Sequence, residues 1–277
     1  MLREWDVAGR RWLGPPYDLR ALAVDATVAP RGRALAVTQV GPASHVAVGL
    51  VSGHVTVLSA AGTPMMRRQS SMEAKTTESK QEDASSKWKV VQEPVVIARE
   101  WIQDMKYSPD GSLLAVGSHD NYIYLLAVGD GYKRIRKLKG HSSYITHLDF
   151  SADSRYLQSN CGAYELLFWS VVDGRQQRSA STLRDVKWAT WTCTLGFAAQ
   201  GIWPPGSDGT DVNAVCRSGS GRLLATADDF GKVKLFKYPC VTQGAKFREY
   251  PGHSSHVTNV CFTDQDEYVV SAGGNDR

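Results

Sequence analysis

The residues that could act as nucleophiles, bases or metal ligands are spread through the sequence, and their spacing matches no catalytic or metal-binding motif. The 277 residues include seven His and five Cys, but no Cys-x-x-Cys pair and no nucleophile, metalloprotease or phosphate-loop motif. Asp228–Gly231 contains the letters Asp-Phe-Gly, yet no His-Arg-Asp loop accompanies them, so a turn between strands explains this stretch. His253 and His256 are three residues apart, but the sequence places no acidic or Cys residue near them at the spacing of a metal site. We expect no catalytic residue, cofactor or metal, with an enzyme as the weak alternative.

A basic cluster and an aromatic insert are the candidates for partner binding. The basic cluster lies on a predicted outer strand and consists of Lys133, Arg134, Arg136, Lys137 and Lys139. It is either a solvated edge strand, whose lysines discourage pairing with other edges, or a surface that attracts acidic partners weakly and in a salt-sensitive way. The insert covers about residues 183–210 and contains Trp188, Trp191 and Trp203. It is either an extra strand with a packed loop, or a partner-facing aromatic patch.

The composition places the chain in an ordinary globular class. It is 42% apolar with a net charge of +4, which by itself points to neither nucleic acid nor a membrane surface. No apolar run approaches the roughly 20 residues that a membrane helix needs, and the N-terminus lacks the apolar segment of a secretory signal. The odd number of cysteines indicates reduced thiols in a cytosolic protein.

An internal repeat organises the elements that carry these residues. Gly140–Ser151 recurs as Gly252–Thr263, with six of twelve positions identical. From Trp101 onward, short apolar strands alternate with turns such as Ser108–Gly111, and the units recur every 40–45 residues or so. Residues 1–65 predict a divergent N-terminal blade, and 96–277 predict the regular units. Between them, 66–95 predict a disordered linker or loop, with phosphorylation at Ser70 and Ser71 as an alternative.

Units of four strands, opened by Gly-His and closed by an aromatic residue, resemble the blades of WD-repeat proteins. The predicted fold is all-β: an incomplete WD-repeat β-propeller of about four to five four-stranded blades, the last one truncated. The resemblance gives structural roles to His141, Trp169, His253 and Asp276, because an Asp in the turn before the third strand usually accepts a hydrogen bond from the buried imidazole. Ala163 occupies that Asp position in the unit of His141, so we expect this network to lack its acceptor.

Several stretches narrow the resemblance to the echinoderm microtubule-associated protein-like family. They are SPDGSLLAVGSHDNYIY, GHSSYITHLDFS, VKWATWTCTLGF, GIWPPGSDGTDVNAVCRS, DDFGKVKLFKYPC and GHSSHVTNVCF. They resemble the last four or five blades of the family's second propeller, without its other parts. The resemblance implies a non-catalytic propeller that binds tubulin or microtubules in the cytoplasm and organises the microtubule cytoskeleton, with no nucleic acid or membrane as partner. The alternative is a generic WD-repeat scaffold for protein assembly.

Overall fold

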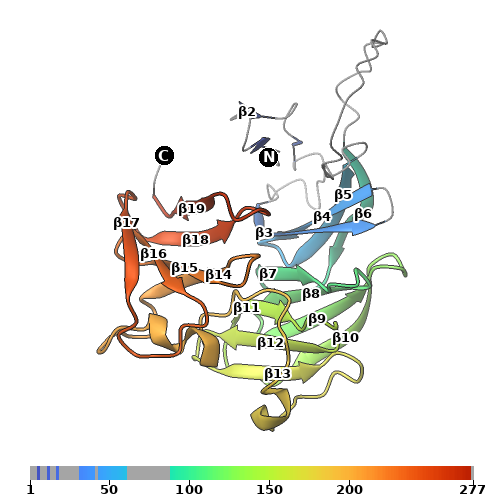
Figure 1. Cartoon of the computed structure of the whole chain (residues 1–277). Helices are drawn as coiled ribbons and strands as arrows, with labels where there is room; N and C mark the ends of the chain where they lie inside the picture. Colours follow the sequence, from blue (N-terminus) through green and yellow to red (C-terminus); the bar gives the residue numbers. More distant parts are fainter. Residues whose placement is uncertain are drawn as a thin grey trace, which may run out of the picture.

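The computed structural model describes residues 5–6, 11–12, 17–18, 31–40, 43–60 and 88–275. Their regular structure consists of antiparallel sheets arranged side by side around a common middle (Figure 1). The first full sheet has the order β3-β4-β5-β6. Its strands are Gly32–Val40, Ala43–Leu50, His54–Ala60 and Trp88–Val96. A separate pair joins β1 (Trp5–Asp6) to β2 (Arg11–Trp12).

Four further sheets follow along the chain. The second contains β7 to β10, which are Ile102–Tyr107, Leu113–Ser118, Tyr122–Ala127 and Lys133–Lys139. The third contains β11 to β13, which are Ile145–Phe150, Tyr156–Cys161 and Leu166–Ser170. The fourth contains β14 to β17, which are Val212–Arg217, Leu223–Asp228, Lys232–Lys237 and Phe247–Pro251. The last pairs β18 (Val257–Phe262) with β19 (Val269–Gly273). This confirms the predicted all-β, incomplete propeller.

From the second sheet onward, a Ser or Thr hydroxyl follows the first strand of each sheet. Ser108 Oγ accepts the N–H of Leu113 at 2.9 Å, and Ser151 Oγ accepts that of Tyr156 at 2.9 Å. The same bond recurs from Leu223 to Ser218 and from Tyr268 to Thr263, at 3.0 and 3.1 Å. A short hydroxyl side chain can satisfy a backbone donor within its own turn. The Ser and Thr at these repeat positions therefore fix the turn that reverses the chain.

Close packing joins successive sheets into one body. A Cβ on Gly49 would lie 2.5 Å from Ile102, and one on Gly117 would lie 2.6 Å from Ile145. Only glycine therefore lets the first strand of the next sheet approach this closely. Leu148 and Leu125 belong to one apolar cluster across the second and third sheets. Such burial of both faces is what a single sheet cannot achieve alone.

Strand β6 corrects the predicted domain boundaries. Residues 88–95, predicted as part of a linker or loop, lie in this strand and pair with β5. Pro94 would normally argue against a strand, but the register shifts between Val55 and Val57, so Pro94 falls where the ladder is interrupted. Residues 66–87 lie outside the described residues, and their predicted disorder stays a prediction.

The aromatic insert is a packed segment between the third and fourth sheets. The 3₁₀ helix η3 (Ala180–Leu183) leads into it, and it contains a second 3₁₀ helix, η4 (Phe197–Ile202). Ala189 donates its N–H to Phe150 O of β11 at 2.9 Å, while Trp191 O accepts the N–H of Arg217 in β14 at 3.1 Å. The insert contributes one isolated bridge, from Trp188 to Ser151, in place of the predicted extra strand. It therefore acts as a spacer between two innermost strands.

Candidate functional site

His141 is the centre of a buried hydrogen-bond chain in the third sheet. The residue lies in the loop between β10 and β11, and its side chain is 1% exposed. Trp169 Nε1 donates to Ser159 Oγ at 2.8 Å, and Ser159 Oγ lies 2.6 Å from His141 Nε2. His141 Nδ1 lies 3.2 Å from Glu165 Oε2. A neutral imidazole with its proton on Nδ1 satisfies every step, because Nε2 then accepts from the serine.

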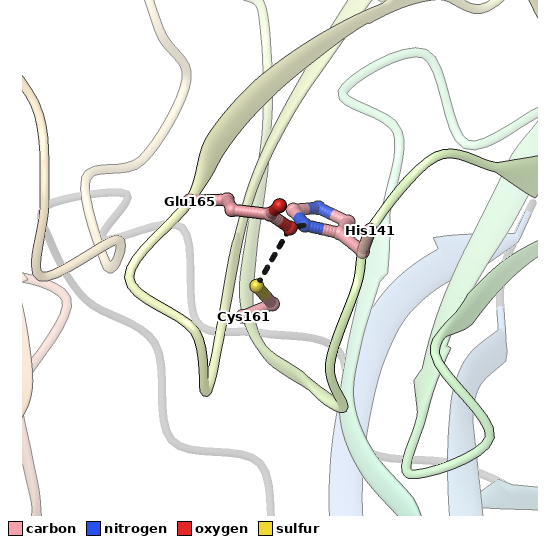
Figure 2. A group of neighbouring side chains, drawn as sticks. All are labelled: His141, Cys161 and Glu165. Atoms are coloured by element: carbon pink, nitrogen blue, oxygen red, sulfur yellow. Dashed lines mark hydrogen bonds and ion pairs between the residues drawn. The ribbon is translucent and has the colours of Figure 1, made fainter.

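Glu165 is the acceptor for His141, and the WD-repeat pattern in the sequence did not predict it. The expectation that Ala163 leaves His141 without an acceptor is wrong, because Tyr164 has a φ of 60° and turns the following carboxylate towards the imidazole. Cys161 Sγ also donates to Glu165 Oε2 at 3.1 Å (Figure 2). The backbone N–H and the hydroxyl of Ser142 each donate to this carboxylate at 2.9 Å. The backbone N–H, followed by the thiol, lowers the pKa of Glu165 to about 2.

The order serine, histidine and glutamate resembles a nucleophilic triad. Whether it could act as one depends on whether a substrate can reach the serine. Ser159 is 0% exposed, and its oxygen already accepts the Trp169 N–H. Burial lowers the pKa of His141, although Glu165 opposes that shift, and burial raises the pKa of the Cys161 thiol. No substrate carbonyl could reach the serine. The arrangement holds β12 and β13 to the start of β11.

The second Gly-His copy is built in the same way. His253 Nε2 lies 2.8 Å from Ser271 Oγ, as His141 does from Ser159. Among the described residues, a Cβ on Gly252 would meet nothing within 4 Å, whereas one on Gly140 would meet Trp169 at 2.8 Å. A hollow of about 550 Å³, lined by Tyr250 and Val269 among others, lies beside Gly252. Asp276 lies outside the described residues, so its role stays a prediction.

The basic cluster lies on β10, at the outer edge of the second sheet (Figure 1). Arg136 is half-buried, and its guanidinium donates to Val172 O in the turn after β13, which gives it a structural role. The Lys137 ammonium lies 3.5 Å from the centroid of the Tyr122 ring, and the Arg134 guanidinium lies 5.6 Å from that of Tyr124. Such contacts hold cations in place while leaving them charged. Four of the five cations remain exposed: Lys133, Arg134, Lys137 and Lys139.

The tryptophans of the insert do not form the partner-facing patch. Trp188 is 9% exposed and Trp191 is 5% exposed, and both pack in the apolar core with Phe236. Trp203 is half-buried, and its Nε1 donates to Thr194 O at 3.1 Å. The aromatic residue that the insert does expose is Phe197, at 74%. The insert therefore uses its tryptophans for packing, because the gap between the two sheets needs large apolar side chains.

A buried carboxylate that the sequence did not single out anchors the insert. Asp149 in β11 is 0% exposed. It accepts the backbone N–H of Thr192 at 2.8 Å and that of Cys193 at 2.9 Å. The Thr190 hydroxyl and the Gln158 amide also donate to it. A carboxylate taken out of water requires this number of donors, so Asp149 fixes where the insert crosses the middle of the molecule.

These features define a WD-type β-propeller with one modified blade network and one interposed insert. A model of the second β-propeller of the echinoderm microtubule-associated protein matches residues 15–277. The chain therefore belongs to the echinoderm microtubule-associated protein-like family. The match begins well before the stretches that carry the resemblance in the sequence.

Similar proteins support this assignment. Echinoderm microtubule-associated protein-like 1 of Homo sapiens is 55% identical over 180 residues, which cover 64% of this chain and 22% of that protein. Echinoderm microtubule-associated protein-like 4 of Xenopus tropicalis is 53% identical over 181 residues, or 64% of this chain and 20% of that protein. Echinoderm microtubule-associated protein-like 2 of Rattus norvegicus is 53% identical over 180 residues, or 64% of this chain and 28% of that protein. The chain thus matches less than a third of each relative. Among the described residues, no helix is long and apolar enough to cross a membrane.

Proposed function

We propose that this chain is a non-catalytic propeller segment that contributes to the binding of tubulin or microtubules in the cytoplasm. Its membership of a family named for microtubule association supports the proposal. So does the burial of Ser159 and His141, which keeps this serine–histidine–glutamate chain out of reach of a substrate.

The main support for the proposal is the row of exposed cationic side chains on β10. Four positive side chains project from one outer strand, and two of them are supported by tyrosine rings. Acidic protein surfaces, such as the acidic tails of tubulin, are attracted to such an edge over roughly 10 Å at 0.1 M salt. Because the strand is at the periphery of its sheet, a partner reaches it without disturbing the core.

Co-sedimentation with stabilised microtubules at low and at moderate salt tests the proposal. We expect the chain to pellet with microtubules at low salt and less strongly at moderate salt, because screening weakens contacts between exposed charges. Absence of the chain from the pellet at both salts would argue against it, and the generic scaffold function would then be favoured. Removing the acidic tubulin tails by limited proteolysis should reduce the bound fraction.

A further inference from the structure

The side chains of His141, Cys161 and Glu165 form a cluster with the chemistry of a metal site. One nitrogen, one sulfur and one carboxylate oxygen lie within 4.8 Å of one another (Figure 2). Two protons now join them: one between His141 and Glu165, over 3.2 Å, and one between Cys161 and Glu165, over 3.1 Å. We propose that this cluster binds a zinc ion, which takes the place of these two protons.

The three ligand atoms lie close enough to bind one zinc ion after side-chain movements of about 1 Å or less. Zinc binds histidine nitrogen and carboxylate oxygen at about 2.0–2.2 Å and thiolate sulfur at about 2.3 Å. Tetrahedral geometry then separates neighbouring ligand atoms by about 3.4–3.6 Å. The two short contacts must therefore lengthen by a few tenths of an ångström. The third pair, His141 Nδ1 and Cys161 Sγ, lies within 4.8 Å and must close by at most about 1.2 Å. The mixed nitrogen, sulfur and oxygen set selects zinc over Mg²⁺ and Ca²⁺, which prefer oxygen ligands alone.

The surrounding hydrogen bonds can accommodate the move of the His141 proton from Nδ1 to Nε2. Nδ1 must be free of its proton to bind the metal, so the proton must be on Nε2 and point to Ser159 Oγ, 2.6 Å away. The serine hydroxyl then donates to Leu167 O, 3.5 Å away, and still accepts from Trp169. A zinc-bound histidine characteristically donates its second N–H in this way. Ser159 would therefore orient the ligand without moving.

The carboxylate is held on one side and open on the other. Ser142 donates its backbone N–H and its hydroxyl to Glu165, which keeps the carboxylate directed at the cluster. The Glu165 side chain is 33% exposed, while that of His141 is 1% exposed. An ion can thus reach the site past Glu165, and water from that side can supply the fourth ligand.

Charge balance also favours a divalent ion. Glu165 is already ionised, and moving the imidazole proton from Nδ1 to Nε2 releases nothing. The Cys161 thiol loses one proton to the solvent as its sulfur binds zinc. The site then contains one thiolate and one carboxylate against two positive charges, so the half-buried cluster is neutral.

Titration of the purified, metal-free full chain with Co²⁺ in the presence of a non-thiol reductant tests the proposal. Cobalt reports a thiolate ligand through a near-ultraviolet charge-transfer band. We expect one equivalent of Co²⁺ to produce this band, Zn²⁺ to displace it, and about one proton to be released for each ion. The absence of a band in the wild-type chain would overturn the proposal.

Two matched cysteine variants identify the site. Cys161→Ser retains a hydroxyl that can donate to Glu165, so it should fold while losing the band. Cys261→Ser removes an exposed free thiol elsewhere and should keep it. Zn²⁺ should raise the melting temperature of the wild-type chain and of Cys261→Ser, but not that of Cys161→Ser. A band that survives in Cys161→Ser or disappears in Cys261→Ser would contradict the assignment.

Discussion

At the scale of single residues, the carboxylate of Glu165 takes the place of the Asp that the WD-repeat pattern expects in the hydrogen-bond network of His141. Ala163 removes the acceptor that the WD-repeat pattern expects, and Glu165 supplies it from two positions further along. The sequence identified His141 and Trp169 because their positions recur with the blade pattern. It did not identify Glu165, because its direction depends on the positive φ of Tyr164, which no residue preference predicts.

The Glu165 carboxylate should make the stability of the chain sensitive to acid. Its folded-state pKa of about 2 is below the ordinary value of 4.5, so its stabilisation is present above about pH 4.5 and is lost as the pH falls towards 2. The lowered pKa of His141 acts in the same direction, because the unfolded histidine protonates first as the pH falls below about 6.5. Both groups therefore destabilise the fold on acidification.

Glu165→Gln should lower the free energy of unfolding by about 1–2 kcal/mol near pH 7, since a charged acceptor of four donors is lost. Its difference from the wild type should shrink as the pH falls below about 4.5. Urea denaturation at several pH values measures both effects. Glu267→Gln, at an exposed position in the turn between β18 and β19, is the control and should leave stability unchanged. A constant difference across that pH range would contradict the account.

At the scale of elements, the residues of the turns predicted the repeat, but they did not predict which side chains pack between neighbouring sheets. The hydroxyls of Ser108 and Ser151 determine turns within their own sheets, so a sequence pattern finds them. The burial of Trp188 depends on the neighbouring sheets, which sequence alone could not place. Strand β6 was missed for a related reason: its partner β5 precedes a long charged stretch, and Pro94 argues against a regular ladder.

The insert should depend on Asp149 for its position. Asp149→Asn keeps the size of the side chain but replaces one acceptor oxygen with a donor, which would face backbone N–H groups. We expect a loss of about 2–4 kcal/mol in the free energy of unfolding, from buried donors left without partners. Hydrogen exchange at Thr192 and Cys193 should accelerate beyond the change in global stability. Asp185→Asn, an exposed carboxylate in the same insert, should change neither property. Unaltered exchange at both sites in Asp149→Asn would exclude the anchoring role.

At the scale of the whole molecule, the described sheets form part of a propeller in which the core and the proposed binding surface are separate. The apolar clusters lie between neighbouring sheets, whereas the exposed cations lie at an outer edge. The order of the blades and the all-β class followed from the repeat, because periodic strands and turns allow few architectures. The structure places Trp188 and Trp191 in the core and gives Arg136 a packing role, so the proposed binding surface consists of the exposed cations of β10.

Microtubule binding by charge variants tests the central claim most directly. Lys133→Glu combined with Lys139→Glu reverses two exposed charges on β10 and leaves Arg136 in place. Lys246→Glu combined with Arg248→Glu makes the same change in charge at the outer strand of the fourth sheet. At low salt we predict that the β10 variant loses most of its microtubule binding in co-sedimentation, while the control variant retains binding close to that of the wild type. Equal losses in both variants, or undiminished binding by the β10 variant, would contradict the claim that this edge contacts the microtubule.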